Sequence, residues 1–77
     1  MLVDVQSRAS QLTPRERQVF ERVVQGNTNK EIARDLGTSP RTIKAHRQKV
    51  MEKVRVQSLA ELVVVAERLG VLPTPGS

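Results

Sequence analysis

The sequence contains no cysteine, no tryptophan and no tyrosine, and only one histidine and one phenylalanine. Without cysteine, disulfides, thiolate metal sites and thiol nucleophiles are all excluded. A single histidine cannot assemble the usual multi-histidine metal site, and one aromatic ring cannot form the stacking platform of a single-strand binder. With 77 residues the chain is also too short for a Rossmann unit or a barrel. We therefore expect no enzyme, no metal and no cofactor.

Long apolar runs are absent as well. No stretch approaches 18 apolar residues, and the first residues lack the basic-then-apolar pattern of a signal peptide. These absences predict a soluble, cytoplasmic protein without a membrane partner. Residues 1–11 show no helical period and are predicted to be a linker or flexible arm, and residues 73–77 a flexible tail. Residues 12–72 remain as one domain.

Positive charge is concentrated in one segment of the chain. The whole sequence has 13 Lys and Arg against 8 Asp and Glu, a formal net charge of +5. Residues 39–55 hold six basic residues and one acidic residue, so this segment alone equals the net charge of the chain. A local basic face of this kind is typical of proteins that bind a polyanion.

Caps and glycines predict four helices in residues 12–72. Thr13, Thr28 and Ser58 each precede a glutamate by three residues, the pattern of a capping box, and Ser39-Pro40 opens a further helix. Glycine, which adopts the left-handed conformation at low cost, follows three of the helices. The four expected helices begin after those caps and end near Gly26, Gly37, Val54 and Gly70.

Apolar residues recur at helical spacing in each predicted helix. The inward-facing set is Val19, Phe20, Val23, Val24, Ile32, Ala33, Leu36, Ile43, Val50, Val54, Leu59, Leu62, Val63, Ala66 and Leu69. The three valines at 63–65 favour a strand locally, but the cap and the apolar stripe around them outweigh that preference. The predicted fold class is all-α, a four-helix bundle.

The second and third predicted helices, 29–36 and 40–54, have the proportions of a helix-turn-helix, with Gly37-Thr38 in the turn. Small bundles that do not bind DNA share these proportions, so the charge of the longer helix has to separate the two interpretations. Its face opposite the core carries Arg41, Lys44, Ala45, Gln48, Glu52 and Arg55, flanked on one side by Thr42, His46, Lys49 and Lys53. This basic face favours DNA binding, with 29–36 as scaffold and 40–54 as recognition helix.

The first turn of the helix at 40–54 contains no acidic residue, whereas the other three predicted helices each carry a glutamate there. Backbone amides near Ser39, Arg41 and Thr42 can therefore donate hydrogen bonds to a phosphate at the positive end of the helix dipole. The alternative is that Ser39 and Pro40 suffice as a cap. We favour the phosphate interpretation because the basic face belongs to the same helix.

Four separated blocks follow one another in order along the chain. They are Leu12-Thr13-Pro14-Arg15-Glu16-Arg17, Asn29-Lys30-Glu31-Ile32-Ala33, Ser39-Pro40-Arg41-Thr42-Ile43-Lys44 and His46-Arg47. Together they resemble the DNA-binding domain of LuxR/FixJ-type bacterial transcription regulators, from about Leu12 to Leu72. The resemblance implies a third helix in the major groove and a homodimer through the fourth. It also implies an N-terminal receiver or sensor domain in the full-length protein, with RNA polymerase as a further partner.

Carried over by position, the resemblance assigns base contacts to Lys44, Ala45 and Gln48. Side-chain chemistry agrees, since glutamine can pair bidentately with adenine, lysine can donate to guanine and an alanine methyl can meet a thymine methyl. The DNA-backbone contacts assigned in the same way are Asn29, Lys30, Ser39, Arg41, Thr42, His46 and Lys49. Ala60 and Val64 point outward on the last helix and are predicted to form the dimer interface.

Two residues depart from the family's pattern. Arg55 stands where a glycine commonly ends the third helix, and Asn27 replaces a commonly apolar residue before the second. The first departure bears on the turn into the last helix and on the angle of the dimer. The second bears on how firmly the second helix is anchored.

Three features have alternative interpretations. His46 is expected to contact phosphate or pack at a flank, because no second histidine or cysteine exists to make it a base or a metal ligand. Glu31 and Asp35 share a face and could hold a cation, but a solvated edge balanced by neighbouring basic residues is the simpler interpretation. Val64 is either ordinary exposed apolar area or a symmetric dimer contact.

The predicted function is sequence-specific binding of double-stranded DNA by the output domain of a bacterial response regulator, located in the bacterial cytoplasm. One rival is a helical protein-interaction module whose basic face docks on an acidic partner. Another is a promoter reader like the last region of a bacterial sigma factor, against which the capped fourth helix argues. Duplex titration at two salt concentrations separates DNA binding from protein docking.

Overall fold

The structure, a computed structural model, describes residues 2–71, with side chains from Val5 onward. Most of these residues are in helices. They are α1 (Leu2–Ala9), α2 (Pro14–Val24), α3 (Asn29–Leu36), α4 (Pro40–Val54) and α5 (Leu59–Arg68). The all-α prediction is confirmed for these residues, whereas the tail predicted at 73–77 lies outside them. None of these helices combines the length and hydropathy that crossing a bilayer requires.

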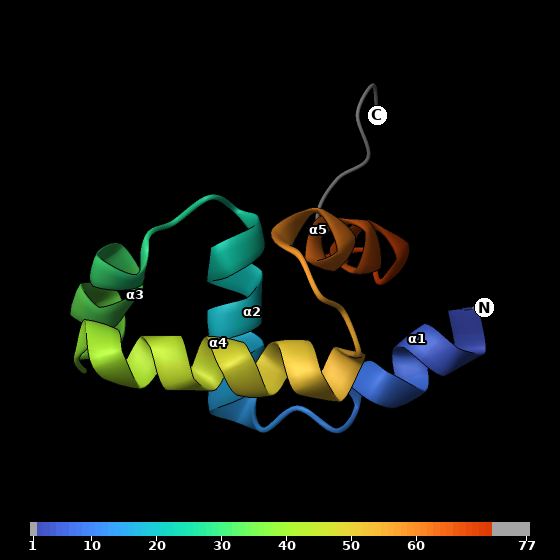
Figure 1. The fold of residues 1–77 in the computed structure, drawn as a ribbon, viewed down its shortest axis with the longest axis horizontal. Coiled ribbons are helices and arrows are strands. Elements are labelled where there is room, and N and C mark those ends of the chain that lie inside the picture. The colour runs from blue at the N-terminus through green and yellow to red at the C-terminus, as the bar shows by residue number, and fades with distance from the viewer. Residues whose placement is uncertain (1, 72–77) are drawn as a thin grey trace.

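Helix α4 runs along the length of the molecule, with α3 at its N-terminal end and α1 beside its C-terminal end (Figure 1). Helix α2 crosses α4, and both α2 and α3 pack on it. Phe20, Ile32, Ile43 and Leu62, one residue from each of α2 to α5, have no exposed side-chain surface. All four belong to one cluster of buried side chains, so the four helices share one core. Burial of each of these side chains contributes about 1.5–3 kcal/mol to stability.

The capping boxes predicted at the starts of α2 and α3 are both present. The Glu16 amide donates to Thr13 Oγ1 over 3.1 Å, and the Thr13 amide donates to Glu16 Oε1 over 2.9 Å. Thr28 and Glu31 make the same two bonds at 3.1 and 2.8 Å. Each box satisfies amides that would otherwise lack a partner, which explains why the two helices begin where the sequence predicts.

The third predicted box, at the start of α5, forms only in part. The Glu61 amide donates to Ser58 Oγ over 3.2 Å, as expected. The Glu61 carboxylate, however, accepts from the amide of Gln57 over 2.6 Å and not from that of Ser58. The Glu61 carboxylate therefore binds the amide of Gln57, one residue before the N-cap, whereas in a capping box it would bind the amide of the N-cap residue itself.

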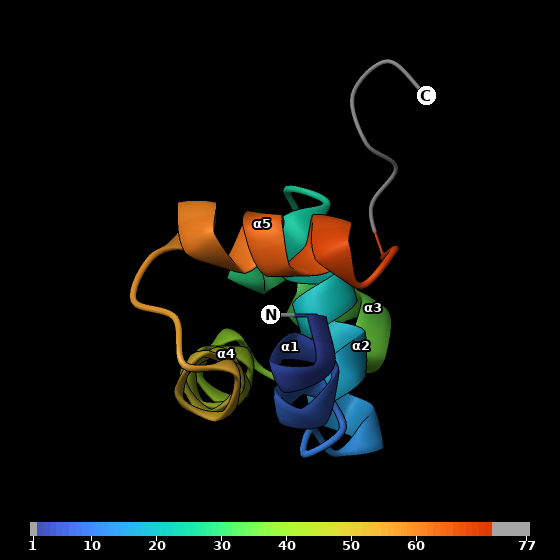
Figure 2. The ribbon, with the colours of Figure 1, turned by 90° about the vertical axis from the view of Figure 1, so that its right-hand side faces the viewer.

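The prediction of a linker or flexible arm over residues 1–11 is corrected by α1, which was not expected. Val5 and Ala9 of this helix are buried against α4 and α5. Figure 2 shows α1 lying beside α4 and below α5. Arg8 Nη1 also donates to the carbonyl of Val54 over 3.4 Å, at the C-terminus of α4. Two buried side chains four residues apart are too few to produce a recognisable period, which is why the sequence did not predict α1.

The presence of α1 also corrects the predicted stripe of α5. Leu62 and Ala66 are buried as expected, but Leu59 is 45% exposed and Val65 is only 9% exposed. Val65 is covered because α1 packs beside α5 on that side. The inward face of α5 is thus turned toward α1 compared with the predicted one.

Candidate nucleic-acid interface

The turn between α3 and α4 forms as the glycine at 37 predicts. Gly37 has φ 69° and ψ 39°, the left-handed conformation that a side chain disfavours. The Thr38 amide donates to the carbonyl of Ala33 over 2.9 Å, which closes the end of α3. Helices α3 and α4 therefore leave the turn at a fixed geometry and pack against each other.

Ser39 caps α4, and its first turn contains no acidic residue. The Thr42 amide donates to Ser39 Oγ over 3.2 Å, and the two hydroxyl oxygens lie 3.0 Å apart. Residues 39–42 are all exposed, so the positive end of the helix dipole faces solvent beside Arg41. The Ser39 cap forms, and no side chain of this first turn is acidic. An approaching anion would therefore meet no carboxylate in this turn.

Helix α4 has two sharply different faces. Ile43, Val50 and Val54 are at most 1% exposed and pack into the core. All three predicted base-contacting residues, Lys44, Ala45 and Gln48, are exposed on the opposite side. Arg41, Thr42 and Lys49, predicted to contact phosphates, are exposed as well. The structure thus brings the predicted interface together on one surface, although what each residue contacts stays a prediction.

Three further residues that are predicted to contact the DNA backbone lie near this surface and differ in exposure. Lys30 is exposed, whereas Asn29 and His46 are half-buried. Arg47 Nη1 donates to Asn29 Oδ1 over 3.3 Å and so links α4 to the start of α3. This bond fixes the orientation of the Asn29 side chain relative to the recognition helix.

Lys53 plays a part that the sequence did not predict. Its ammonium lies 2.7 Å from Glu16 Oε1, and the Glu16 side chain is buried. The lysine hydrogen bond, aided by the Thr13 amide, lowers the pKa of the Glu16 carboxyl below its usual value. The positive charge of Lys53 is therefore balanced by Glu16, and Lys53 adds little to the basic face. No local signal marks this pair, since the two residues are 37 positions apart.

The carboxylates that could have suggested a cation site are engaged by protein groups. Glu31 accepts from the Thr28 amide, which lowers the pKa of its carboxyl. Asp35 Oδ2 lies 3.0 Å from Arg22 Nη1, a contact between α3 and α2. Within residues 2–71 no three His, Cys, Asp or Glu side chains cluster as metal ligands do. Glu31 and Asp35 thus belong to the helix cap and to the packing of α3 on α2.

Helix α5 carries the remaining predicted contacts. Val64 is 46% exposed and Ala60 is exposed, as the sequence predicts for a dimer interface. Exposure of this kind is compatible with ordinary surface apolar area as well. Their pairing with a second subunit therefore stays a prediction.

Comparison with known proteins assigns a family to this arrangement. Residues 10–66 match the family described as "Bacterial regulatory proteins, luxR family". Transcriptional regulatory protein FixJ of Bradyrhizobium diazoefficiens is 49% identical over 90% of this chain and 34% of its own length. Transcriptional regulatory protein UhpA of Escherichia coli is 51% identical over 71% of this chain and 28% of its own. The solved structure of full-length FixJ from B. japonicum matches with a TM-score of 0.82 and 48% identity, over 92% of this chain and 35% of that one.

Proposed function

The chain belongs to the LuxR family of bacterial regulatory proteins, whose helix-turn-helix domain it forms, and we propose that it reads duplex DNA with α4 in the major groove. As a DNA-binding output domain of response regulators it is not an enzyme. The observation that carries the proposal is the division of α4 into a buried apolar face and an exposed face bearing Lys44 and Gln48. A helix with one such face fits a groove that admits a single α-helix.

Base readout is assigned to Lys44, Ala45 and Gln48. Their exposure on one surface of α4 supports the assignment, because all three can approach base edges at once. Gln48 pairs bidentately with adenine, Lys44 donates to guanine, and the Ala45 methyl packs on a thymine methyl. These contacts supply the sequence preference.

Phosphate contacts position the domain on the duplex. They are assigned to Asn29, Lys30, Ser39, Arg41, Thr42, His46 and Lys49. The exposed first turn of α4 supports the assignment, because Arg41 faces solvent there, at the positive end of the helix dipole and without a competing carboxylate. These contacts make affinity depend steeply on salt, since each neutralised phosphate releases counterions.

Two copies of the domain bind together through α5, with Ala60 and Val64 at the contact. The exposed valine supports this assignment. A two-fold symmetric pair then reads two half-sites about one helical turn, ~10 bp, apart.

The chain spans about a third of the length of the curated relatives it matches, 34% of one FixJ and 33% of another. We infer a regulatory receiver or sensor domain N-terminal to it in the full-length regulator. The regulator acts on DNA in the bacterial cytoplasm, with RNA polymerase as a further partner.

Selection of bound duplexes from a random pool tests the proposal. We expect enrichment of a half-site that recurs about 10 bp apart, with binding that weakens steeply between two salt concentrations. Enrichment of no sequence, together with capture of an acidic protein segment by the same basic face, would instead establish a protein-docking module.

A further inference from the structure

Two basic residues of α4 are turned toward neighbouring helices and not toward its exposed face. Lys53 pairs with the buried carboxylate of Glu16. Arg47 is half-buried and donates from Nη1 to Oδ1 of Asn29, the first residue of α3, over 3.3 Å. It lies four residues after the buried Ile43, which places it about 40° from the centre of the core face. Arg47 therefore lies between the core face and the exposed face, beside the start of α3.

The charges of these two residues meet different partners. Lys53 meets a carboxylate, which balances its charge. Arg47 meets a neutral amide, and it makes no ion pair among the described residues. The positive charge of Arg47 therefore still acts on a group that approaches the Asn29 amide.

The bond to Arg47 determines which end of the Asn29 amide is left for another partner. A guanidinium group has only donors, so it binds the amide oxygen. The amide nitrogen, on the other side of Cγ, is then turned away from Arg47 and carries two N–H donors. No described residue accepts a hydrogen bond from them. Asn29 thus offers two donors beside the exposed Lys30.

We propose that Arg47 is a positioning residue, which holds the Asn29 amide so that Nδ2 donates to a backbone phosphate of the DNA. The inference rests on the proposed DNA binding and specifies how one of its phosphate contacts is made. Arg47 also polarises the amide, because linked hydrogen bonds strengthen one another. A donor at the far end of a chain that begins at a cation suits an anionic acceptor. Arg47 thus favours phosphate at Asn29 without touching it.

Two other roles of Arg47 have different consequences. If the guanidinium contacted a phosphate directly, its removal would lower the dependence of log affinity on log salt, the salt slope, by about one. If the bond only held α3 on α4, its loss would shift the base-reading residues and change the base preference. A positioning role lowers the affinity for every duplex and leaves both quantities unchanged, because the group that contacts the phosphate is uncharged.

A double-mutant cycle on the full 77-residue chain tests the proposal. The variants are Asn29→Ala, Arg47→Ala and the two combined. The probe is a duplex with a single selected half-site, so that pairing of two copies does not contribute. Affinity is measured at several salt concentrations, on the selected half-site and on one with a changed base. Circular dichroism of each variant ensures that lost affinity is not lost folding.

We expect Asn29→Ala and Arg47→Ala each to weaken binding by roughly five- to tenfold, equally on both duplexes and with an unchanged salt slope. The double variant should bind no more weakly than Asn29→Ala, since Arg47 acts through the amide. Arg47→Lys keeps a long donor and should recover part of the lost affinity.

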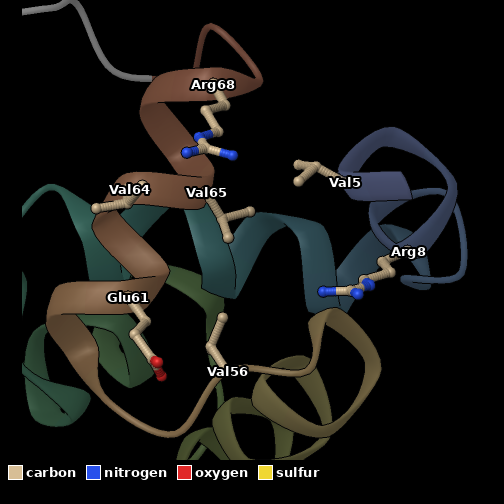
Figure 3. Close-up of a pocket in the computed structure, with 7 residues that line it drawn as sticks. All are labelled: Val5, Arg8, Val56, Glu61, Val64, Val65 and Arg68. Carbon is tan, nitrogen blue, oxygen red and sulfur yellow. The ribbon is translucent and has the colours of Figure 1, made fainter. Parts of the chain in front are cut away.

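Arg68→Ala is the matched control, because it also removes the charge of one arginine. Arg68 is exposed and lines a groove whose described walls come from α1, α5 and the loop before α5 (Figure 3). Its removal should change neither the affinity for a single half-site nor the salt slope. Lys49→Ala is the opposite reference, since loss of a lysine that contacts phosphate directly should lower the slope by about one.

Three results would overturn the proposal. A salt slope lowered by about one in Arg47→Ala, with an effect that adds to that of Asn29→Ala, would show that Arg47 contacts phosphate itself. A changed base preference in Arg47→Ala would show that the bond only holds α3 on α4. Full affinity in Asn29→Ala would remove this phosphate contact and leave the proposed function in place. A wild-type chain that binds both duplexes equally would contradict the proposed function as well.

Discussion

The ammonium of Lys53 lies 2.7 Å from the buried carboxylate of Glu16, and this contact fastens the C-terminal half of the recognition helix to the first turn of α2. The same carboxylate oxygen accepts from the Thr13 amide over 2.9 Å. One side chain thus caps a helix and holds a second helix in place. The orientation of α4, on which the proposed DNA-binding surface depends, is therefore tied to Glu16, a buried residue of another helix.

Glu16→Gln should separate these two tasks. Glutamine can still cap α2, but the charge that pairs with Lys53 is lost, and we expect a destabilisation of about 1–3 kcal/mol. Urea unfolding followed by circular dichroism measures it. Glu21→Gln is the matched control, because its pair with Arg17 is exposed and should contribute less than about 1 kcal/mol. Equal effects of the two substitutions would contradict the role assigned to Glu16.

The lowered pKa of Glu16 predicts a pH dependence of stability. Because the folded pKa lies below the usual value near 4.5, the unfolded chain binds the proton more readily. The contribution of Glu16 is therefore complete above that value and is lost as pH falls through the folded pKa. Urea unfolding from pH 7 to pH 3 should show a smaller loss in Glu16→Gln than in the wild-type chain. The remaining loss includes Glu31, whose pKa is also lowered by its cap. Parallel curves for both chains would refute the assignment.

Arg55 ends α4 in the left-handed conformation, with φ 59° and ψ 50°. A residue with a side chain pays about 1–2 kcal/mol there, whereas glycine does not but loses more entropy on folding. We expect Arg55→Gly to stabilise the domain by up to about 1 kcal/mol, measured by thermal unfolding. Gly37→Ala, at another helix end in the left-handed conformation, should destabilise by about 1 kcal/mol. Loss of stability in Arg55→Gly would show that the arginine side chain contributes more than its backbone strain costs.

Base readout and phosphate contact should respond differently to truncation. Lys44→Ala and Gln48→Ala are expected to weaken binding to the selected duplex by about 1–3 kcal/mol and to relax base preference, whereas Lys49→Ala should weaken all duplexes about equally. Competition with random-sequence duplex in a bandshift series separates the two effects. A sequence-independent loss for Gln48→Ala would remove it from the base-reading set.

Val64 and Leu59 offer a matched pair on α5, since they are 46% and 45% exposed. Val64→Asp should abolish cooperative binding to two half-sites without changing the far-ultraviolet circular dichroism spectrum. Leu59→Asp, at the first position of the helix and on a different side of it from Val64, should leave cooperativity intact. Equal losses in the two variants would argue against an interface at Val64.

The parts of the fold that were predicted correctly depend on residues close in sequence. The caps at Thr13 and Thr28 and the stop at Gly37 each involve side chains or amides within a few positions, and all three form as expected. The buried and exposed faces of α4 follow from its period alone. The exposed face of α4, which we propose faces DNA, was predictable for the same reason, since it is what remains once the core face is known.

The parts that were missed depend on contacts between distant segments. Helix α1 is held by Val5 and Ala9 against elements more than 40 residues away, and the position of α1 then decides that Val65 rather than Leu59 is covered. The pair of Glu16 and Lys53 likewise joins two helices whose separation in sequence is 37 residues. No periodicity or cap pattern reports such pairings.

The division of α4 into two faces has a consequence for how regulators of this kind diverge. Lys44, Ala45 and Gln48 are exposed, while the residues that hold the helix in place are buried on its other side. Under the proposed base readout, substitutions at the three exposed positions change the preferred operator with little effect on folding. In this way regulators with the same buried core can recognise different promoters.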